Sequence, residues 1–272
     1  MKRILITGAS SGIGAATALH LDRCGMEVFA ATRAPGDGDD ALTRASDRLR
    51  RITLDVTDPG SIAEAIAAVG EGGLDGLVNN AGIGVPGPLE VLPVDALRDQ
   101  LEVNVLGQVA VTQAALPLLR KASGRIVFVG SVGGRLAAQF AGAYHASKFA
   151  MEAIADVWRQ ELEPEELSVI LVEPSAISTP IWDKAVARLD ALLADVDPRL
   201  VRYRDRLREF QESLRSADEH GKPPEDVAAT IEQALTEDSP DTRYVVGASG
   251  TLVTVLRPLI PDRLADKLAE RA

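Results

Sequence analysis

The 272-residue sequence has little of several residue types that define large classes of protein. Its one cysteine, Cys24, cannot form a disulfide within the chain, so we expect a reducing compartment, the cytoplasm. The three histidines, His20, His145 and His220, have no metal-ligand companions at a workable spacing in the sequence, and no metal is expected. Basic residues are also few, with 29 Lys and Arg against 40 Asp and Glu. The resulting net charge of −11 argues against a nucleic-acid partner, whose phosphate backbone requires a basic surface.

Long hydrophobic runs are missing as well. Runs such as residues 126–129 have the length of a strand and fall far short of the roughly 20 residues that a membrane-spanning helix needs. The apolar run behind Met1-Lys2-Arg3 reaches a glycine after four residues, which is too short for the core of a secretory leader. We therefore expect neither a transmembrane segment nor a leader. Since 46% of the residues are hydrophobic and the length suits one large domain, we expect a single domain over residues 1–272.

Short apolar runs alternate regularly with helical patterns along the chain. Seven strands are predicted, at residues 3–7, 27–32, 51–55, 76–79, 124–130, 168–173 and 243–246. Their nearly continuous apolar runs are typical of strands that are buried on both faces. This order of elements predicts an α/β fold, a doubly wound parallel sheet of seven strands with helices on both faces. Ligands of such sheets bind beyond the C-terminal ends of the strands, so candidate site residues are sought there.

A glycine-rich turn follows the first predicted strand and precedes a helical pattern. Its spacing is Gly8-x-x-x-Gly12-x-Gly14. In a strand, turn and helix of this kind, glycines let backbone N–H groups approach a pyrophosphate, and the start of the helix presents unpaired donors to it. The predicted cofactor contacts in this turn are Gly8, Ser10, Ser11, Gly12, Ile13 and Gly14.

Tyr144 and Lys148 are four residues apart, and on a helix such residues point to the same side. A positive charge near a phenol favours the phenolate and lowers a tyrosine pKa that is normally about 10. We therefore expect Lys148 to lower the pKa of Tyr144 and to fit it for proton transfer. Ser131 follows the fifth predicted strand, where it can bind the same substrate oxygen or simply cap a turn.

Together these motifs resemble the short-chain dehydrogenase/reductase family. The residues that carry the resemblance, in the order and at the spacing of the family, are Thr7 to Gly14, Asn79-Asn80-Ala81-Gly82, Asn104, Ser131 and Tyr144-x-x-x-Lys148. The match runs from about residue 3 to residue 180, and residues 177–182 resemble the retinol- and steroid-dehydrogenase-like branch. The resemblance implies a Rossmann-like fold, hydride transfer between a nicotinamide cofactor and an alcohol/carbonyl pair, and assembly as a homodimer or homotetramer.

The resemblance also implies a role for each site residue. Tyr144 would act as the acid/base, Ser131 would orient the substrate, and Lys148 would bind the nicotinamide ribose. Asn104 would hold a water in a proton relay, although it could instead be a satisfied polar group of a helix. Further cofactor contacts are implied at Asp55, Val56, Asn80, Ala81, Gly82, Pro174, Ile177 and Thr179. Relatives usually carry glycine after this proline, and Ser175 stands there instead, so the loop could differ in shape.

The residue after the second predicted strand bears on the choice of coenzyme. Arg33 stands where an acidic residue would bind a ribose hydroxyl of NAD, and an arginine accommodates the 2′-phosphate of NADP. NADP(H) is therefore expected to be preferred, with NAD(H) possible. Two features favour an ordinary surface arginine instead: Ser11 stands where many NADP-preferring relatives have a basic residue, and Asp37, Asp39 and Asp40 follow closely.

Residues 181–222 carry apolar side chains at helical spacing and are expected to form a helical lid over the substrate. The apolar stripe, which includes Trp182, Leu189 and Leu193, indicates either a hydrophobic substrate or ordinary packing on the body. The expected partner is a small, apolar alcohol or carbonyl compound. Two alternatives stay open at this point: a non-catalytic dinucleotide-binding regulator, and a dehydratase or epimerase on the same fold.

Overall fold

The structure is a computed structural model that describes residues 1–38, 40–195, 197–247, 260, 261 and 263. Seven strands within these residues form one parallel sheet in the order β3-β2-β1-β4-β5-β6-β7. They are β1 (Arg3–Ile6), β2 (Glu27–Thr32), β3 (Leu49–Thr53), β4 (Gly76–Asn79), β5 (Arg125–Val129), β6 (Ser168–Pro174) and β7 (Arg243–Val246). The strand order reverses between β1 and β4, as in a doubly wound sheet, and the predicted fold class is confirmed.

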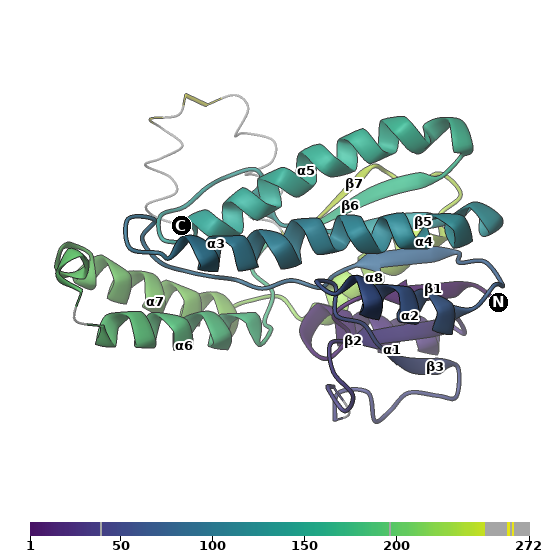
Figure 1. Cartoon of the computed structure of the whole chain (residues 1–272), viewed down its shortest axis with the longest axis horizontal. Helices are drawn as coiled ribbons and strands as arrows, with labels where there is room; N and C mark the ends of the chain where they lie inside the picture. The colour runs from purple at the N-terminus through teal and green to yellow at the C-terminus, as the bar shows by residue number, and fades with distance from the viewer. Residues whose placement is uncertain (39, 196, 248–259, 262, 264–272) are drawn as a thin grey trace.

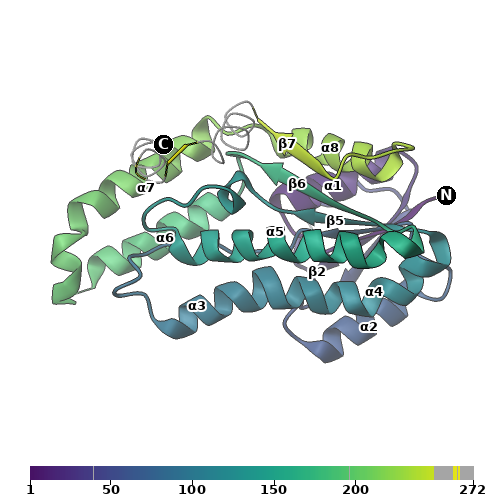
Figure 2. The ribbon, with the colours of Figure 1, turned by 90° about the horizontal axis from the view of Figure 1, so that it is seen from above.

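Helices cover both faces of the sheet (Figures 1 and 2). One face carries α1 (Gly12–Arg23) and α8 (Pro224–Thr236), and the other carries α2 (Pro59–Val69), α4 (Gln108–Ala122) and α5 (Gly142–Leu162). Neighbouring residues of a strand point to opposite faces. In β1, Ile4 and Ile6 are buried in the core with α1 and α8, whereas Leu5 is buried in the core with the other three helices. The strands therefore need apolar residues at nearly every position.

A further pair of helices extends away from the sheet after β6 (Figure 1). It consists of α6 (Ile181–Ala194), the short η4 (Pro198–Arg202) and α7 (Arg204–Glu219). The pair has an apolar core of its own, which includes Leu189, Leu200, Leu207 and Leu214 and which also takes in Phe140 from the body. Residues 181–222 are thus helical, as their spacing predicts.

The remaining helices lie on either side of β5. Before it, α3 (Val94–Leu101), a π-helical turn η1 (Glu102–Gly107) and α4 follow one another without a break. After it, the short turns η2 (Val132–Gly134) and η3 (Glu163–Glu165) flank α5. No helix of the described residues has both the length and the apolarity that crossing a bilayer requires.

One predicted strand is displaced. The sequence predicted a strand at residues 51–55, whereas β3 begins at Leu49 and ends two residues before Asp55. It is an edge strand, paired with β2 alone, and its Arg50 and Arg51 are exposed. An edge strand with charged residues does not show the apolar run by which the other strands were located.

Candidate active site

The glycine-rich turn between β1 and α1 has no room for side chains at two of its glycines. A Cβ on Gly14 would lie 2.3 Å from the carbonyl oxygen of Gly8, and one on Gly8 would lie 2.8 Å from Cα of Ala81. Gly8 and Gly12 also have φ values of +66° and +54°, a region that favours glycine. Ser11 precedes α1 and makes no side-chain capping bond. The start of α1 is therefore open to an anion, and this cradle fits the predicted pyrophosphate.

Thr7 joins the ends of β1 and β4. Its hydroxyl accepts hydrogen bonds from the N–H groups of Asn80 and Ala81, both at 3.0 Å. The Asn80 amide donates in turn to the carbonyl oxygens of Thr7 at 2.9 Å and Gly8 at 3.1 Å. Sequence reasoning did not place Thr7 among the site residues, although it opens the glycine motif. The predicted Asn80 and Ala81 thus hold the glycine turn against β4.

Arg33 directly follows β2 and is exposed, and its guanidinium has no partner within the described residues. The loop that it opens lies against the glycine turn, since a Cβ on Gly38 would come within 2.6 Å of Cα of Ser10. The N–H of Ala9 also donates to the carbonyl oxygen of Ala31 at 2.9 Å. Arg33 is therefore close to the turn and free to bind an anion, as recognition of a 2′-phosphate requires.

Asp55 uses one carboxylate oxygen within its own turn. Its Oδ1 accepts hydrogen bonds from the N–H of Thr57 at 2.9 Å and from the Thr57 hydroxyl at 2.7 Å. Val56 is buried against Gly107, where a Cβ would lie 2.8 Å from Cγ2 of Val56. A cofactor contact at Val56 would consequently use its backbone.

Tyr144 lies in the first turn of α5, and Ser131 lies between β5 and η2. The Ser131 hydroxyl accepts a hydrogen bond from the N–H of Gly133 at 3.0 Å, and the Ser131 side chain lies beside the Tyr144 phenol. Ser131 is thus a turn cap and at the same time a partner of the phenol. Burial raises the pKa of Tyr144, and the Ser131 hydroxyl lowers it. Two hydroxyl groups meet here at the C-terminal edge of the sheet.

Lys148 follows one turn later on α5 and is buried. Its Nζ donates a hydrogen bond to the carbonyl oxygen of Val129 at 2.8 Å and lies 5.7 Å from the centre of the Tyr144 ring. Burial lowers the pKa of Lys148 to about 8, an effect that the Glu152 carboxylate opposes. The predicted lowering of the Tyr144 pKa by Lys148 is not found in this structure. Desolvation dominates at the phenol, and the ammonium is engaged by the Val129 carbonyl instead.

Asn104 lies in the π-helical turn η1 and is buried. Its Oδ1 accepts a hydrogen bond from the N–H of Ile83 at 2.8 Å, and its Nδ2 donates to the Ile83 carbonyl at 3.0 Å and the Ser147 hydroxyl at 3.1 Å. A Cβ on Gly82 would lie 3.4 Å from that Oδ1. Asn104 is therefore a satisfied polar group that ties the loop after β4 to α5. Its part in a proton relay stays a prediction.

The loop after β6 accommodates Ser175 without a positive φ. Pro174 ends the strand, with its carbonyl oxygen 3.5 Å from the Ser131 hydroxyl. The N–H of Ser175 donates to the carbonyl oxygen of Val246 at 2.9 Å. A positive φ, +112°, falls instead on Gly247, where a Cβ would lie 2.0 Å from the Ser175 Oγ. The departure from the family pattern at Ser175 is thus matched by a glycine at the end of β7.

Ile177 and Thr179, which both follow β6, lie differently with respect to the glycine turn. The Thr179 side chain packs on Gly12, where a Cβ would lie 3.1 Å from it, and the Thr179 N–H donates to Asp218 of α7 at 3.1 Å. Ile177 is buried in the core beside α1 and α8, and its carbonyl oxygen accepts the indole N–H of Trp182 at 2.6 Å. Of the two predicted contacts, Thr179 is the one with its side chain at the turn.

Residues 2–190 match the family model of short chain dehydrogenases. The chain belongs to the short-chain dehydrogenase/reductase family. It is 37% identical to retinol dehydrogenase 5 of Mus musculus, over 97% of this chain and 86% of that protein. It is 33% identical to an NADPH-dependent 3-dehydrocapnine reductase of Ornithobacterium rhinotracheale, over 98% of this chain and 96% of that one. A solved short-chain dehydrogenase from Streptomyces avermitilis matches with a TM-score of 0.79 at 29% identity, covering 99% of this chain and 95% of the other.

Membership of the short-chain dehydrogenase/reductase family confirms the predicted oxidoreductase class, which acts on CH–OH groups with a nicotinamide cofactor. The similarity to retinol dehydrogenase confirms the predicted branch. These findings favour oxidation and reduction over a non-catalytic regulator and over a dehydratase or epimerase.

A buried charge cluster in this short-chain dehydrogenase lies behind Lys148 and escaped sequence reasoning. Glu173 on β6 and Glu152 on α5 both bind the Arg135 guanidinium, at 3.0 Å and 2.9 Å. Arg243 of β7 lies 3.4 Å from Glu173 and 3.3 Å from Glu152. Burial and the neighbouring Glu173 raise the pKa of Glu152 to about 7. Glu152 continues the spacing of four from Lys148 and could have been found, whereas Glu173 is hidden in a strand pattern.

The helix pair of this short-chain dehydrogenase differs from the expected lid in one respect. Leu189, which the sequence predicted to face a substrate, is fully buried in the core of α6 and α7. Trp182 and Leu193 are partly buried at the same core. The apolar stripe therefore serves first to hold the two helices together.

Proposed function

We propose that this protein interconverts an alcohol and a carbonyl with NADP(H), acting on an apolar substrate. The observation that carries the proposal is the pairing of the Ser131 and Tyr144 side chains at the C-terminal edge of the sheet, with Lys148 one turn away. Two adjacent hydroxyl groups can both bond a single substrate oxygen on which charge develops. The similarity to retinol dehydrogenase 5 supports chemistry at an alcohol.

In carbonyl reduction the Tyr144 phenol donates its proton to the substrate oxygen, while Ser131 holds that oxygen by a second hydrogen bond. A pKa above the usual range keeps the phenol protonated and suits it to donate. The nicotinamide, when bound, supplies the hydride. Lys148, with a pKa of about 8, returns a proton to Tyr144, and Asn104 anchors the relay beside it through Ser147. In alcohol oxidation each proton moves in the opposite direction.

NADP(H) is the cofactor that this proposal prefers, with NAD(H) as the second choice. The exposed Arg33 beside the glycine turn supports it, because its guanidinium has no partner within the described part of the chain. Asp37, one of the acidic residues that follow, is engaged by its own loop, where it accepts the N–H of Ala34 at 3.3 Å. The NADPH dependence of the related 3-dehydrocapnine reductase supports the same choice.

Residues 181–222 act in this proposal as a lid over an apolar substrate. The exposed Leu89, in the loop after β4, supports an apolar contact close to the chemistry. Its side chain would lie 3.0 Å from a Cβ on Gly142, two residues before Tyr144. The pair α6 and α7 is tied to the loop after β6 by Asp218 and by Trp182. Such a pair is placed to exclude water from the reacting atoms.

The proposal extends to assembly and location. The outer face of α4 and α5 carries a mostly apolar hollow, in which Val157 is 51% exposed and which is lined by Val109, Ala153, Ile154, Val157, Trp158 and Glu161. We infer that a second copy covers this face in a homodimer or homotetramer, so Val157→Arg should give a smaller species in light scattering. The single cysteine favours a cytoplasmic location, which cell fractionation would test.

The reaction is tested by following NADPH oxidation by the purified protein with a panel of retinoid, steroid and short aliphatic aldehydes and ketones. We expect turnover with an apolar carbonyl and a large loss of that turnover in Tyr144→Phe. The proposed function would be overturned if no compound of the panel supported NADPH oxidation, or if Tyr144→Phe kept the wild-type rate.

A further inference from the structure

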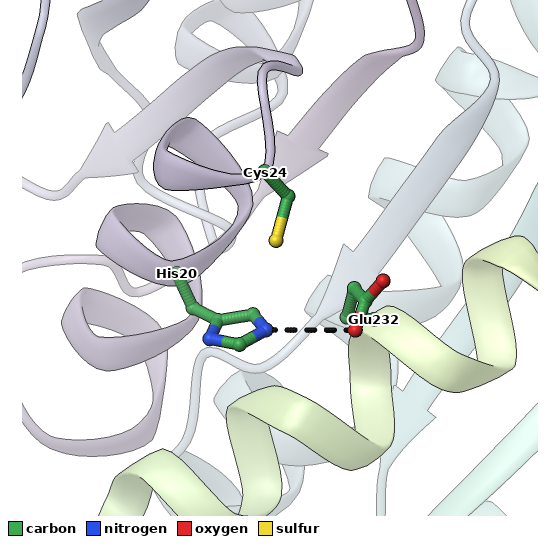
Figure 3. A group of neighbouring side chains, drawn as sticks. All are labelled: His20, Cys24 and Glu232. Atoms are coloured by element: carbon green, nitrogen blue, oxygen red, sulfur yellow. Dashed lines mark ion pairs between the residues drawn. The ribbon is translucent and has the colours of Figure 1, made fainter.

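His20, Cys24 and Glu232 gather where α1 packs against α8 (Figure 3), at the end of α1 opposite the glycine turn. His20 lies in the last turn of α1, Cys24 directly follows that helix, and Glu232 lies on α8. One ligand atom from each side chain lies within 4.8 Å of the other two. No metal was expected from the sequence, where the spacing of four residues between His20 and Cys24 was overlooked, and the third member comes from a helix near the other end of the chain.

The distances suit a shared ion better than a hydrogen bond. His20 Nε2 lies 3.6 Å from Glu232 Oε2, and this nitrogen is buried without a hydrogen-bond partner. A hydrogen bond between the two would be shorter, near 2.9 Å. Two ligand atoms bound tetrahedrally to zinc at about 2.0–2.3 Å lie roughly 3.3–3.8 Å apart. His20 and Glu232 therefore have the separation of two ligands of one ion, and the Cys24 sulfur lies within 4.8 Å of both ligand atoms.

The charges of the cluster are also complementary to a dication. The Cys24 thiol and the Glu232 carboxylate each offer a ligand atom beside His20. Coordination to a cation removes the thiol proton. A thiolate and a carboxylate then neutralise two positive charges, and the neutral imidazole of His20 adds a third ligand. Cys24 is exposed, which leaves a path by which an ion can enter.

We propose that His20, Cys24 and Glu232 bind a divalent metal ion of the zinc type, with water as the fourth ligand. A set of one imidazole, one thiolate and one carboxylate favours zinc or cobalt and disfavours magnesium and calcium, which take oxygen ligands. The ion would join the end of α1 to α8. Since α1 has 12 residues, the site lies about 18 Å from the glycine turn. Its effect is therefore on the stability of the packing between α1 and α8.

The test uses Co²⁺ as the probe, added to the whole protein after dialysis against chelator. We expect one Co²⁺ per chain, an intense near-ultraviolet band from thiolate coordination, and displacement by Zn²⁺. Cys24→Ser should remove this band, and His20→Ala and Glu232→Gln should each weaken binding at least about tenfold. Zn²⁺ should raise the thermal unfolding midpoint of the wild type and leave that of the three variants unchanged.

The matched control is His220→Ala, since His220 is an exposed histidine at the end of α7. It should bind Co²⁺ as the wild type does, and NADPH turnover should be retained in all four variants, which verifies their fold. No saturable Co²⁺ binding in the micromolar range would overturn the proposal. A spectrum that survives Cys24→Ser, or equal losses in His220→Ala, would do the same.

Discussion

At the scale of single residues, the Tyr144 phenol lies among groups with opposite effects on its proton. Burial raises its pKa, and the Ser131 hydroxyl lowers it. The Lys148 ammonium lies 5.7 Å from the ring and bonds the Val129 carbonyl. The neutral phenol is favoured near pH 7, so Tyr144 is better prepared to donate a proton to a carbonyl than to take one from an alcohol.

Tyr144→Phe removes this proton and keeps the ring. We expect turnover to fall at least about a hundredfold, the usual scale for a positioned acid/base group, with little change in the dissociation constant for NADPH. Steady-state kinetics and a fluorescence titration measure the two quantities. Tyr244→Phe is the matched control. The Tyr244 hydroxyl donates to Glu237, whose carbonyl oxygen accepts a hydrogen bond from Arg125 at the start of β5. This hydroxyl therefore lies at the edge of the sheet opposite Tyr144. Near-wild-type turnover in Tyr144→Phe would mean that another group supplies the proton.

Arg33→Ala tests the predicted preference for NADP(H) over NAD(H). A charge-assisted hydrogen bond to phosphate contributes about 1.5–3 kcal/mol, so the KM for NADPH should rise about tenfold or more, and the KM for NADH should hardly change. Initial rates with each coenzyme give both values. Arg44→Ala removes an exposed cation further along the same loop and should alter neither KM. If the wild type uses both coenzymes equally, Arg33 is an ordinary surface arginine.

At the scale of elements, α5 carries Tyr144, Lys148 and Glu152 at successive intervals of four residues. The middle of α5 meets β6 where Glu152 lies beside Glu173. The Oε2 of Glu173 is buried without a hydrogen-bond donor. A proton on Glu152, whose pKa is raised by burial and by the neighbouring Glu173, would supply that donor. The charged groups that face the pair are Arg135 after β5, Arg243 of β7, and Lys148 and Asp156 of α5.

The raised pKa of Glu152 predicts a dependence of stability on pH. A carboxyl group whose pKa is raised by folding stabilises the folded state at low pH and loses that effect as the pH approaches its folded pKa. Because the pKa of Glu152 is raised from 4.5 to about 7, the free energy of unfolding should fall between about pH 5 and pH 7, by roughly 1 kcal/mol or more. Glu152→Gln offers Glu173 a permanent N–H donor and should flatten this fall.

Denaturant unfolding of the wild type and Glu152→Gln across that range measures the difference in slope. Glu64→Gln changes an exposed carboxylate on α2 and should keep the wild-type slope. An unchanged slope in Glu152→Gln would show that the pair does not hold a proton at these pH values.

The elements also show what the sequence could and could not predict. Six predicted strands agree with the structure to within one residue at each end, because an apolar run between two helical layers is a local property. The edge strand β3 lacks that property and was misplaced. Ser131 and Arg33 were predicted as site residues because they follow strands, and the structure places them after β5 and β2. The charge cluster around Glu173 and the burial of Leu189 were not predicted. Both are set by which elements pack together, and no local sequence pattern indicates this packing.

At the scale of the whole molecule, Phe140 connects the helix pair to the catalytic segment. Its ring centre lies 6.1 Å from that of Tyr203 and 5.8 Å from that of Phe210, in the core of α6 and α7. Its carbonyl oxygen accepts the N–H of Gly87 at 2.7 Å, and its φ is +63°, a region that residues other than glycine seldom adopt. The loop after β4, the segment before Tyr144 and the helix pair thus meet at one residue.

This arrangement predicts that an apolar substrate lies between the helix pair and Tyr144. Each buried methylene contributes up to about 0.8 kcal/mol, or roughly fourfold, so kcat/KM should rise with chain length along a series of aliphatic aldehydes or ketones. Leu89→Asp should flatten that rise and leave the KM for NADPH unchanged, because Leu89 is exposed beside the start of α5. Leu189→Asp is unsuitable, since a charge at this buried position would disrupt the core of the helix pair.

Val201→Asp is the matched control for Leu89→Asp. Val201 is 68% exposed on η4, the connection between α6 and α7 at the end of the pair far from the sheet (Figure 1). Val201→Asp adds the same charge to a similarly exposed apolar position. The rise of kcat/KM with chain length should therefore persist in this variant. If the wild-type series is flat, or if small charged carbonyls are the better substrates, the helix pair does not enclose an apolar substrate. If both variants flatten the rise equally, the effect belongs to the added charge and Leu89 makes no substrate contact.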